Sequence, residues 1–210
     1  MPSPAYDTFR KSMKLDFDAW KEGTGYDMDA FDGMTADEKT AVVKEILARG
    51  TEEPLDWRDM EILSHENSRE AFDRLRDELV GRSCDQQSKA LRYTFQAERR
   101  MGEAVFDNML ARILDAVTSD DGVTQSLICV DMYCGPRTKA ALDRGMRERP
   151  DVAIHFACKL LNLAEVADDW VDFDPRYRPT LVKLLPGSRP AERAEALAKV
   201  DQWLAKAGKR

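Results

Sequence analysis

Apolar residues recur at three- and four-residue steps along most of the chain, which is the spacing of one buried face on an α-helix. The predicted helices come in pairs, and the first helix of each pair begins near residues 36, 69, 102, 137 and 176. A helix pair cannot bury its apolar face alone, so repeated pairs are expected to stack on one another. No segment alternates apolar and polar residues with a period of two, and the pattern therefore predicts an all-α fold.

The expected helix boundaries have specific signals. Thr35 followed by Glu38 is a capping-box arrangement at the start of a helix that ends near Gly50. Asp56 and Ser68 stand where N-cap residues are expected, each directly before an apolar stripe. These signals divide the chain into short helices joined by tight turns.

The two ends differ from the middle of the chain. Residues 5 to about 21 carry an aromatic stripe, which predicts a helix that covers the open end of the array: Tyr6, Phe9, Met13, Phe17 and Trp20. Residues 26–33 are expected to cross over as an acidic loop or short turn. We therefore predict a single domain over 1–210, with an N-terminal capping helix and acidic loop (1–34), helical repeats (35–167) and a C-terminal helical pair (168–210).

Composition limits the class of protein. The chain of 210 residues is 43% hydrophobic and 34% charged, which predicts a soluble protein without a membrane-spanning helix. No apolar run follows the N-terminus, so no secretory signal is expected and a cytoplasmic location is predicted. The four cysteines and two histidines lack the spacing of zinc ligands. We expect buried thiols in a reducing compartment, with no metal and no cofactor.

Charge is distributed unevenly along the chain. Residues 1–62 have a net charge of −7, residues 63–174 of −6, and residues 175–210 of +6. An acidic front repels phosphate backbones, so nucleic-acid binding is disfavoured. A protein partner steered by charge, or weak head-to-tail self-association, fits better, although charge on helical proteins is mostly solvated surface.

Three segments resemble HEAT-like repeat proteins. They are residues 56–63, the following residues 68–71, and residues 151–157, where an aspartate before a helix rich in small residues is typical of such repeats. Residues 20–27 look like the lead-in of small bacterial HEAT-like proteins. The resemblance implies a right-handed α-solenoid of about five helical hairpins with an N-terminal capping helix. It implies protein interaction more than catalysis. Members of similar build act beside bacterial toxin systems as immunity or accessory proteins.

Polar stripes on the second helices of successive pairs are the candidate binding residues, since stacking would align them along one concave surface. They are Arg92, Gln96, Asp131, Tyr133, His155, Lys159 and Asn162. A second candidate surface is the acidic and aromatic stretch of Asp168, Asp169, Trp170 and Asp172. For each stripe the alternative is solvated helix surface, and Trp170 could instead pack on the neighbouring helix pair.

The competing function is an enzyme that acts on nucleic-acid bases. A DNA glycosylase-like HEAT protein needs a basic groove with aromatic residues and an assisting acid, and Asp131, Tyr133 and Arg92 could supply that set. The overall acidity argues against it. No nucleophile elbow, phosphate loop or HExxH sequence is present. The sequence therefore predicts a non-catalytic scaffold whose partner is another protein, plausible examples being a toxin or effector of the same bacterium.

Overall fold

The computed structural model describes residues 2–14, 25–49, 53–66, 68–96, 102–167 and 174–207, and these are folded almost entirely as helices and turns. Within those ranges there is no β-strand, and the β-type pairing is confined to isolated bridges from Thr118 to Asp121 and Gly122. The prediction of an all-α fold is confirmed. None of the helices in the described ranges is long and apolar enough to cross a membrane.

The helices follow the predicted pairs. The N-terminal half contains α1 (Pro4–Ser12), α3 (Met28–Asp32), α4 (Ala36–Leu47), α5 (Trp57–His65), α6 (Arg69–Asp77) and α7 (Cys84–Gln96). The C-terminal half contains α8 (Glu103–Ala116), α9 (Val123–Met132), α10 (Pro136–Glu148), α11 (Ala153–Leu163), α12 (Arg178–Leu181), the 3₁₀ helix η1 (Val182–Leu184) and α13 (Pro190–Ala207).

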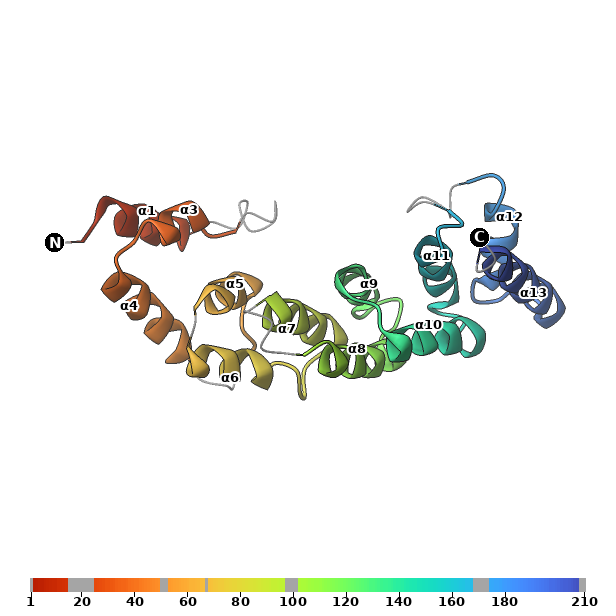
Figure 1. The fold of residues 1–210 in the computed structure, drawn as a ribbon, viewed down its shortest axis with the longest axis horizontal. Helices are drawn as coiled ribbons and strands as arrows, with labels where there is room; N and C mark the ends of the chain where they lie inside the picture. Colours follow the sequence, from red (N-terminus) through yellow and green to blue (C-terminus); the bar gives the residue numbers. More distant parts are fainter. Residues whose placement is uncertain are drawn as a thin grey trace.

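The helices lie in two rows along an elongated molecule (Figure 1). One row contains α4, α6, α8 and α10, and the other contains α5, α7, α9 and α11. The strongest contacts join helices that are adjacent or next but one in sequence, such as α5 with α7, α7 with α9, and α8 with α10. The terminal helices α1 and α13 lie at opposite ends of the molecule (Figure 1). We name the row of α5, α7, α9 and α11 the inner row, and its counterpart the outer row.

One hydrophobic core runs between the two rows from the N-terminal helices to α13. Phe9, Phe106 and Phe156 are fully buried at three separate places along the molecule. Their burial follows from the predicted apolar stripes, because each helix turns its stripe toward the neighbouring row. Continuous burial of this kind keeps successive helix pairs in a fixed order.

The predicted helix signals act as expected. The Thr35 hydroxyl accepts a bond from the Glu38 backbone N–H, and the Glu38 carboxylate accepts one from the Thr35 N–H, which completes the capping box. That carboxylate also accepts bonds from the backbone N–H (2.7 Å) and hydroxyl (2.9 Å) of Ser3. Asp56 and Ser68 cap α5 and α6 through their side chains. Glu38 thus fastens the first helix to the start of α4.

Two predictions for the N-terminus differ from the structure. Helix α1 ends at Ser12, short of the predicted end near residue 21, and residues 15–24 lie outside the described residues. The expected loop at 26–33 contains the short helix α3. Asp27 starts this helix by accepting a bond from the Ala30 N–H at 2.8 Å, and Phe31 packs on Phe9 with 5.4 Å between ring centroids. Capping and aromatic burial together favour a helix over a loop here.

Acidic side chains also join one helix pair to the next. Asp121 accepts bonds from the backbone N–H groups of Cys84 (2.9 Å) and Asp85 (3.0 Å) at the start of α7. The neighbouring Gly122 has a left-handed backbone with φ of 81°, and a Cβ there would lie 2.6 Å from that same backbone. Only glycine satisfies both the turn and the close approach. The turn before α9 therefore packs directly against the N-terminal end of α7.

Candidate functional site

A hollow of about 440 Å³ lies between α5 and α7 of the inner row. Helix α5 contributes Glu61, Ser64 and His65, and helix α7 contributes Arg92, Tyr93 and Gln96. The structure thus brings the predicted pair Arg92 and Gln96 together at one hollow. We refer to it below as the α5–α7 hollow.

Sequence reasoning missed the residues that α5 adds to this hollow. Glu61 and His65 are four residues apart and so share one side of α5. That spacing was a usable signal, but the helix was interpreted only by its apolar stripe. Tyr93 is 6% exposed, and its phenol pKa is raised by burial and by the Glu61 carboxylate. The Tyr93 phenol therefore stays neutral, and its mostly buried ring lines the hollow.

A second hollow of about 390 Å³ lies between α9 and α11. It is lined by Leu127, Ile154, His155, Cys158, Lys159, Asn162 and Leu185. The predicted stripe of His155, Lys159 and Asn162 therefore does share a face. Leu185 is 41% exposed at its edge, which adds an apolar contact surface beside the polar stripe. We refer to it below as the α9–α11 hollow.

Two of the predicted binding residues bind each other. The Lys159 ammonium donates to the Asp131 carboxylate at 2.5 Å, which joins α11 to α9. The Lys159 side chain is only 10% exposed, whereas that of Asp131 is 56% exposed. The pair therefore holds the two helices together and leaves the α9–α11 hollow without a free charge from Lys159.

Tyr133 is placed apart from the hollows. Its ring meets that of Phe106 on α8 edge to face, with 6.1 Å between centroids. Because Asp131 faces α11 and Tyr133 packs toward the outer row, the structure does not bring these two residues onto one surface. The predicted residues Asp168, Asp169 and Trp170, together with Asp172, lie outside the described residues.

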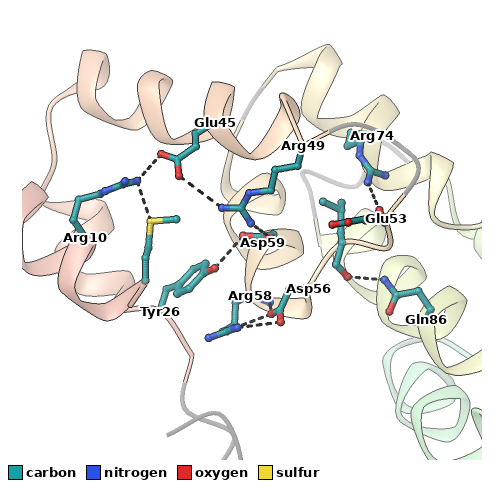
Figure 2. A network of polar contacts seen from close by, with 12 residues as sticks. Arg10, Tyr26, Glu45, Arg49, Glu53, Asp56, Arg58, Asp59, Arg74 and Gln86 are labelled. Atoms are coloured by element: carbon teal, nitrogen blue, oxygen red, sulfur yellow. Dashed lines mark hydrogen bonds and ion pairs between the residues drawn. The ribbon is translucent and has the colours of Figure 1, made fainter. Parts of the chain in front are cut away.

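A polar network around the buried Asp59 joins the N-terminal helices to α5 (Figure 2). The Tyr26 hydroxyl donates to Asp59 Oδ1 at 3.1 Å, and Arg49 Nη1 donates to Asp59 Oδ2 at 2.6 Å. Arg10 of α1 pairs with Glu45 of α4 at 2.6 Å (Figure 2). Asp59 is 2% exposed. Sequence reasoning missed this cluster, because nothing local marks Asp59 as buried.

Burial governs the protonation of the network. It raises the pKa of Asp59 against the opposing charge of Arg49, and it raises the pKa of Tyr26 to about 12 with help from the Asp59 carboxylate. A perturbed acid is a common mark of an active site, but structural networks produce the same shift. Neither hollow described above is lined by Asp59 or Tyr26, so we assign the network to fold stability.

The cysteine and metal chemistry of the described residues is limited. Cys129 is 1% exposed, its thiol donates to the Ser88 carbonyl at 3.2 Å, and burial raises its pKa to about 12. A thiol with that pKa is a poor nucleophile. Across the described ranges no group of three His, Cys, Asp or Glu side chains is placed to hold a metal ion.

Comparison of the chain with models of protein families finds no match, and neither do comparisons with curated proteins or with solved structures. The two hollows are therefore the structural features from which a function can be inferred. Both lie between consecutive inner-row helices, and both contain polar residues that the sequence pattern had singled out.

Proposed function

We propose that this protein is a non-catalytic scaffold that binds another protein along its inner row of helices. In this proposal the helix pairs form a right-handed α-solenoid of HEAT-like hairpins, and the partner is a bacterial toxin or effector that the scaffold holds as an immunity or accessory protein. The observation that carries the proposal is the pair of inner-row hollows, each lined by side chains from two successive helices of that row, with Leu185 beside η1 added in the second.

Hollows of this kind suit a protein partner. Each combines apolar or aromatic surface with a few polar side chains, which is the composition of a protein interface rather than of an enclosed small-molecule pocket. Tyr93 and Arg92 in one hollow are of the residue types that carry most binding energy at interfaces, and Leu127 and Ile154 give the other an apolar base. Two separated contacts also fix the orientation of a partner.

A nucleic-acid base enzyme receives no specific support from this arrangement. The acid proposed for that role, Asp131, is neutralised by Lys159, and Tyr133 packs on Phe106 instead of facing the same surface. The alternative stays a prediction that DNA retention at low salt would test.

The test is a charge-reversal experiment on the inner row. The wild-type chain is used to capture partners from its native cells, which are identified by mass spectrometry and then produced in pure form. Binding is measured by calorimetry for the wild type and for a double variant, Arg92→Glu with His155→Glu. We expect at least a tenfold loss of affinity, since each hollow then carries a wrong charge.

The matched control reverses charge on the outer row. Arg69 is 91% exposed and Arg76 is 59% exposed, both on α6. The variant Arg69→Glu with Arg76→Glu changes the net charge at least as much and should bind normally. Equal affinity of the inner-row variant and the wild type for each captured partner would refute the proposed interface.

A further inference from the structure

The α5–α7 hollow contains one carboxylate and one guanidinium that are not paired. Among the described residues, Glu61 and Arg92 take part in no ion pair, and the Arg92 guanidinium lies over the Tyr93 ring, 5.4 Å from the ring centroid. Other arginines of the molecule are compensated by a carboxylate, for example Arg144, which pairs with Asp115 at 2.6 Å. Both charges of this hollow therefore remain available to a ligand.

The α9–α11 hollow provides the internal contrast. Its one lysine, Lys159, is neutralised by Asp131 across the helix interface. A partner gains little from charge at that place, because the existing pair would have to be separated first. The two hollows therefore select for different features of a partner, and charge recognition belongs to the α5–α7 hollow.

The two signs limit which ligand fits. A phosphate or other pure anion that approaches Arg92 also meets the Glu61 carboxylate, and a pure cation at Glu61 meets Arg92. A group that carries an acid and a base side by side compensates both charges at once, and no charge is left desolvated without a partner. Gln96 adds amide donors on the side of Arg92.

We propose that the α5–α7 hollow binds a bipolar segment of the protein partner, in which an acidic side chain contacts Arg92 and a basic side chain contacts Glu61. An acid and a base four residues apart on a helix surface present such a pair. The partner being a protein rests on the proposed function above. The new element is the charge pattern that the partner presents to this hollow.

The experiment uses the full chain, labelled with ¹⁵N, in an NMR titration. The probe is a capped helical peptide that carries Glu and Lys four residues apart. We expect shifts confined to Ser64, His65 and the Gln96 side chain, with a dissociation constant on the order of 1 mM. The variants Arg92→Gln and Glu61→Gln should each weaken binding about three- to tenfold. The matched control Arg112→Gln, an exposed position on α8, should leave it unchanged.

Two further titrations distinguish the chemistry. A peptide in which both charged residues are replaced by Gln should give no saturable shift, and neither should inorganic phosphate. Equal binding of the neutral peptide, saturation by phosphate alone, or the absence of shifts at this hollow with the bipolar peptide would each overturn the proposal.

Failure here can be told apart from failure of the proposed function. If the captured partner loses affinity for the Arg92→Glu with His155→Glu protein but binds the Arg92→Gln and Glu61→Gln proteins as it binds the wild type, the scaffold function holds and the bipolar site is wrong. If the partner binds the inner-row variant as tightly as it binds the wild type, the scaffold interface itself is wrong.

Discussion

Gly145 on α10 offers a direct test of how the two rows pack. A Cβ added there would lie 2.5 Å from Cε2 and 2.6 Å from Cδ2 of Phe156 on α11. Phe156 is fully buried, so its rigid ring has little room to move. The variant Gly145→Ala therefore sets helix propensity against packing at a single position.

The magnitudes favour packing. Replacing glycine by alanine inside a helix ordinarily stabilises by about 1 kcal/mol. Forcing a methyl group into a filled core costs about 1–3 kcal/mol, and a contact well under 3.0 Å belongs at the upper end. We expect a net loss of about 1–2 kcal/mol in the free energy of unfolding, or about 2–8 °C in Tm for a chain of this size.

The assay is urea and thermal unfolding followed by circular dichroism at 222 nm. A double-mutant cycle with Phe156→Leu supplies the control, since the smaller side chain makes room for the new methyl group. Phe156→Leu should cost about 1 kcal/mol alone and much less in the Gly145→Ala background. A stabilised Gly145→Ala protein would show that α10 and α11 do not pack as described.

Three further outcomes are expected. Asp107 is 5% exposed and accepts a hydrogen bond from the Thr138 N–H at 2.8 Å at the start of α10. Asp107→Ala should therefore lower the free energy of unfolding in urea by about 1–3 kcal/mol. An unchanged unfolding midpoint would contradict the capping role. Hydrogen bonds from Ser3, chiefly its backbone N–H, help to lower the pKa of Glu38 from 4.5 to about 2. The stability from Glu38 is therefore complete above pH 4.5 and is lost as the pH falls through 2; Glu38→Gln should flatten that part of the pH–stability curve. Cys129, with its pKa of about 12, should react with a thiol reagent only after unfolding, and rapid labelling of the native protein at this position would show that it is exposed.

Local signals predicted the helices well because they act over one turn. The capping box of Thr35 and Glu38 and the N-caps at Asp56 and Ser68 are contacts between residues two or three apart, which a sequence pattern contains in full. The apolar stripes likewise indicate which face of each helix is buried. The end of α1 and the presence of α3 depend on contacts such as Phe9 with Phe31, and these join residues 22 positions apart.

The candidate site was predicted less completely for the same physical reason. Helix periodicity placed Arg92 with Gln96 and His155 with Asn162, since each pair lies on one helix face. It could not show that Lys159 is neutralised by Asp131, because that pair spans two helices 28 residues apart in sequence. Contacts between helices determine which polar side chains of a stripe can contact a partner, and helix periodicity contains no information on those contacts.

In the proposed scaffold the two hollows therefore contribute differently to binding of the partner: one mainly to affinity and the other mainly to specificity. The α9–α11 hollow combines Leu127, Ile154 and the exposed edge of Leu185 with an ion pair that is already satisfied, so burial of apolar surface would supply its affinity. The α5–α7 hollow presents uncompensated charges of both signs, which contribute more to discrimination between partners than to affinity. Neutral substitutions such as Arg92→Gln should accordingly weaken binding of the protein partner modestly while widening the range of partners accepted. The variant Leu127→Ala should instead weaken the binding of every such partner alike.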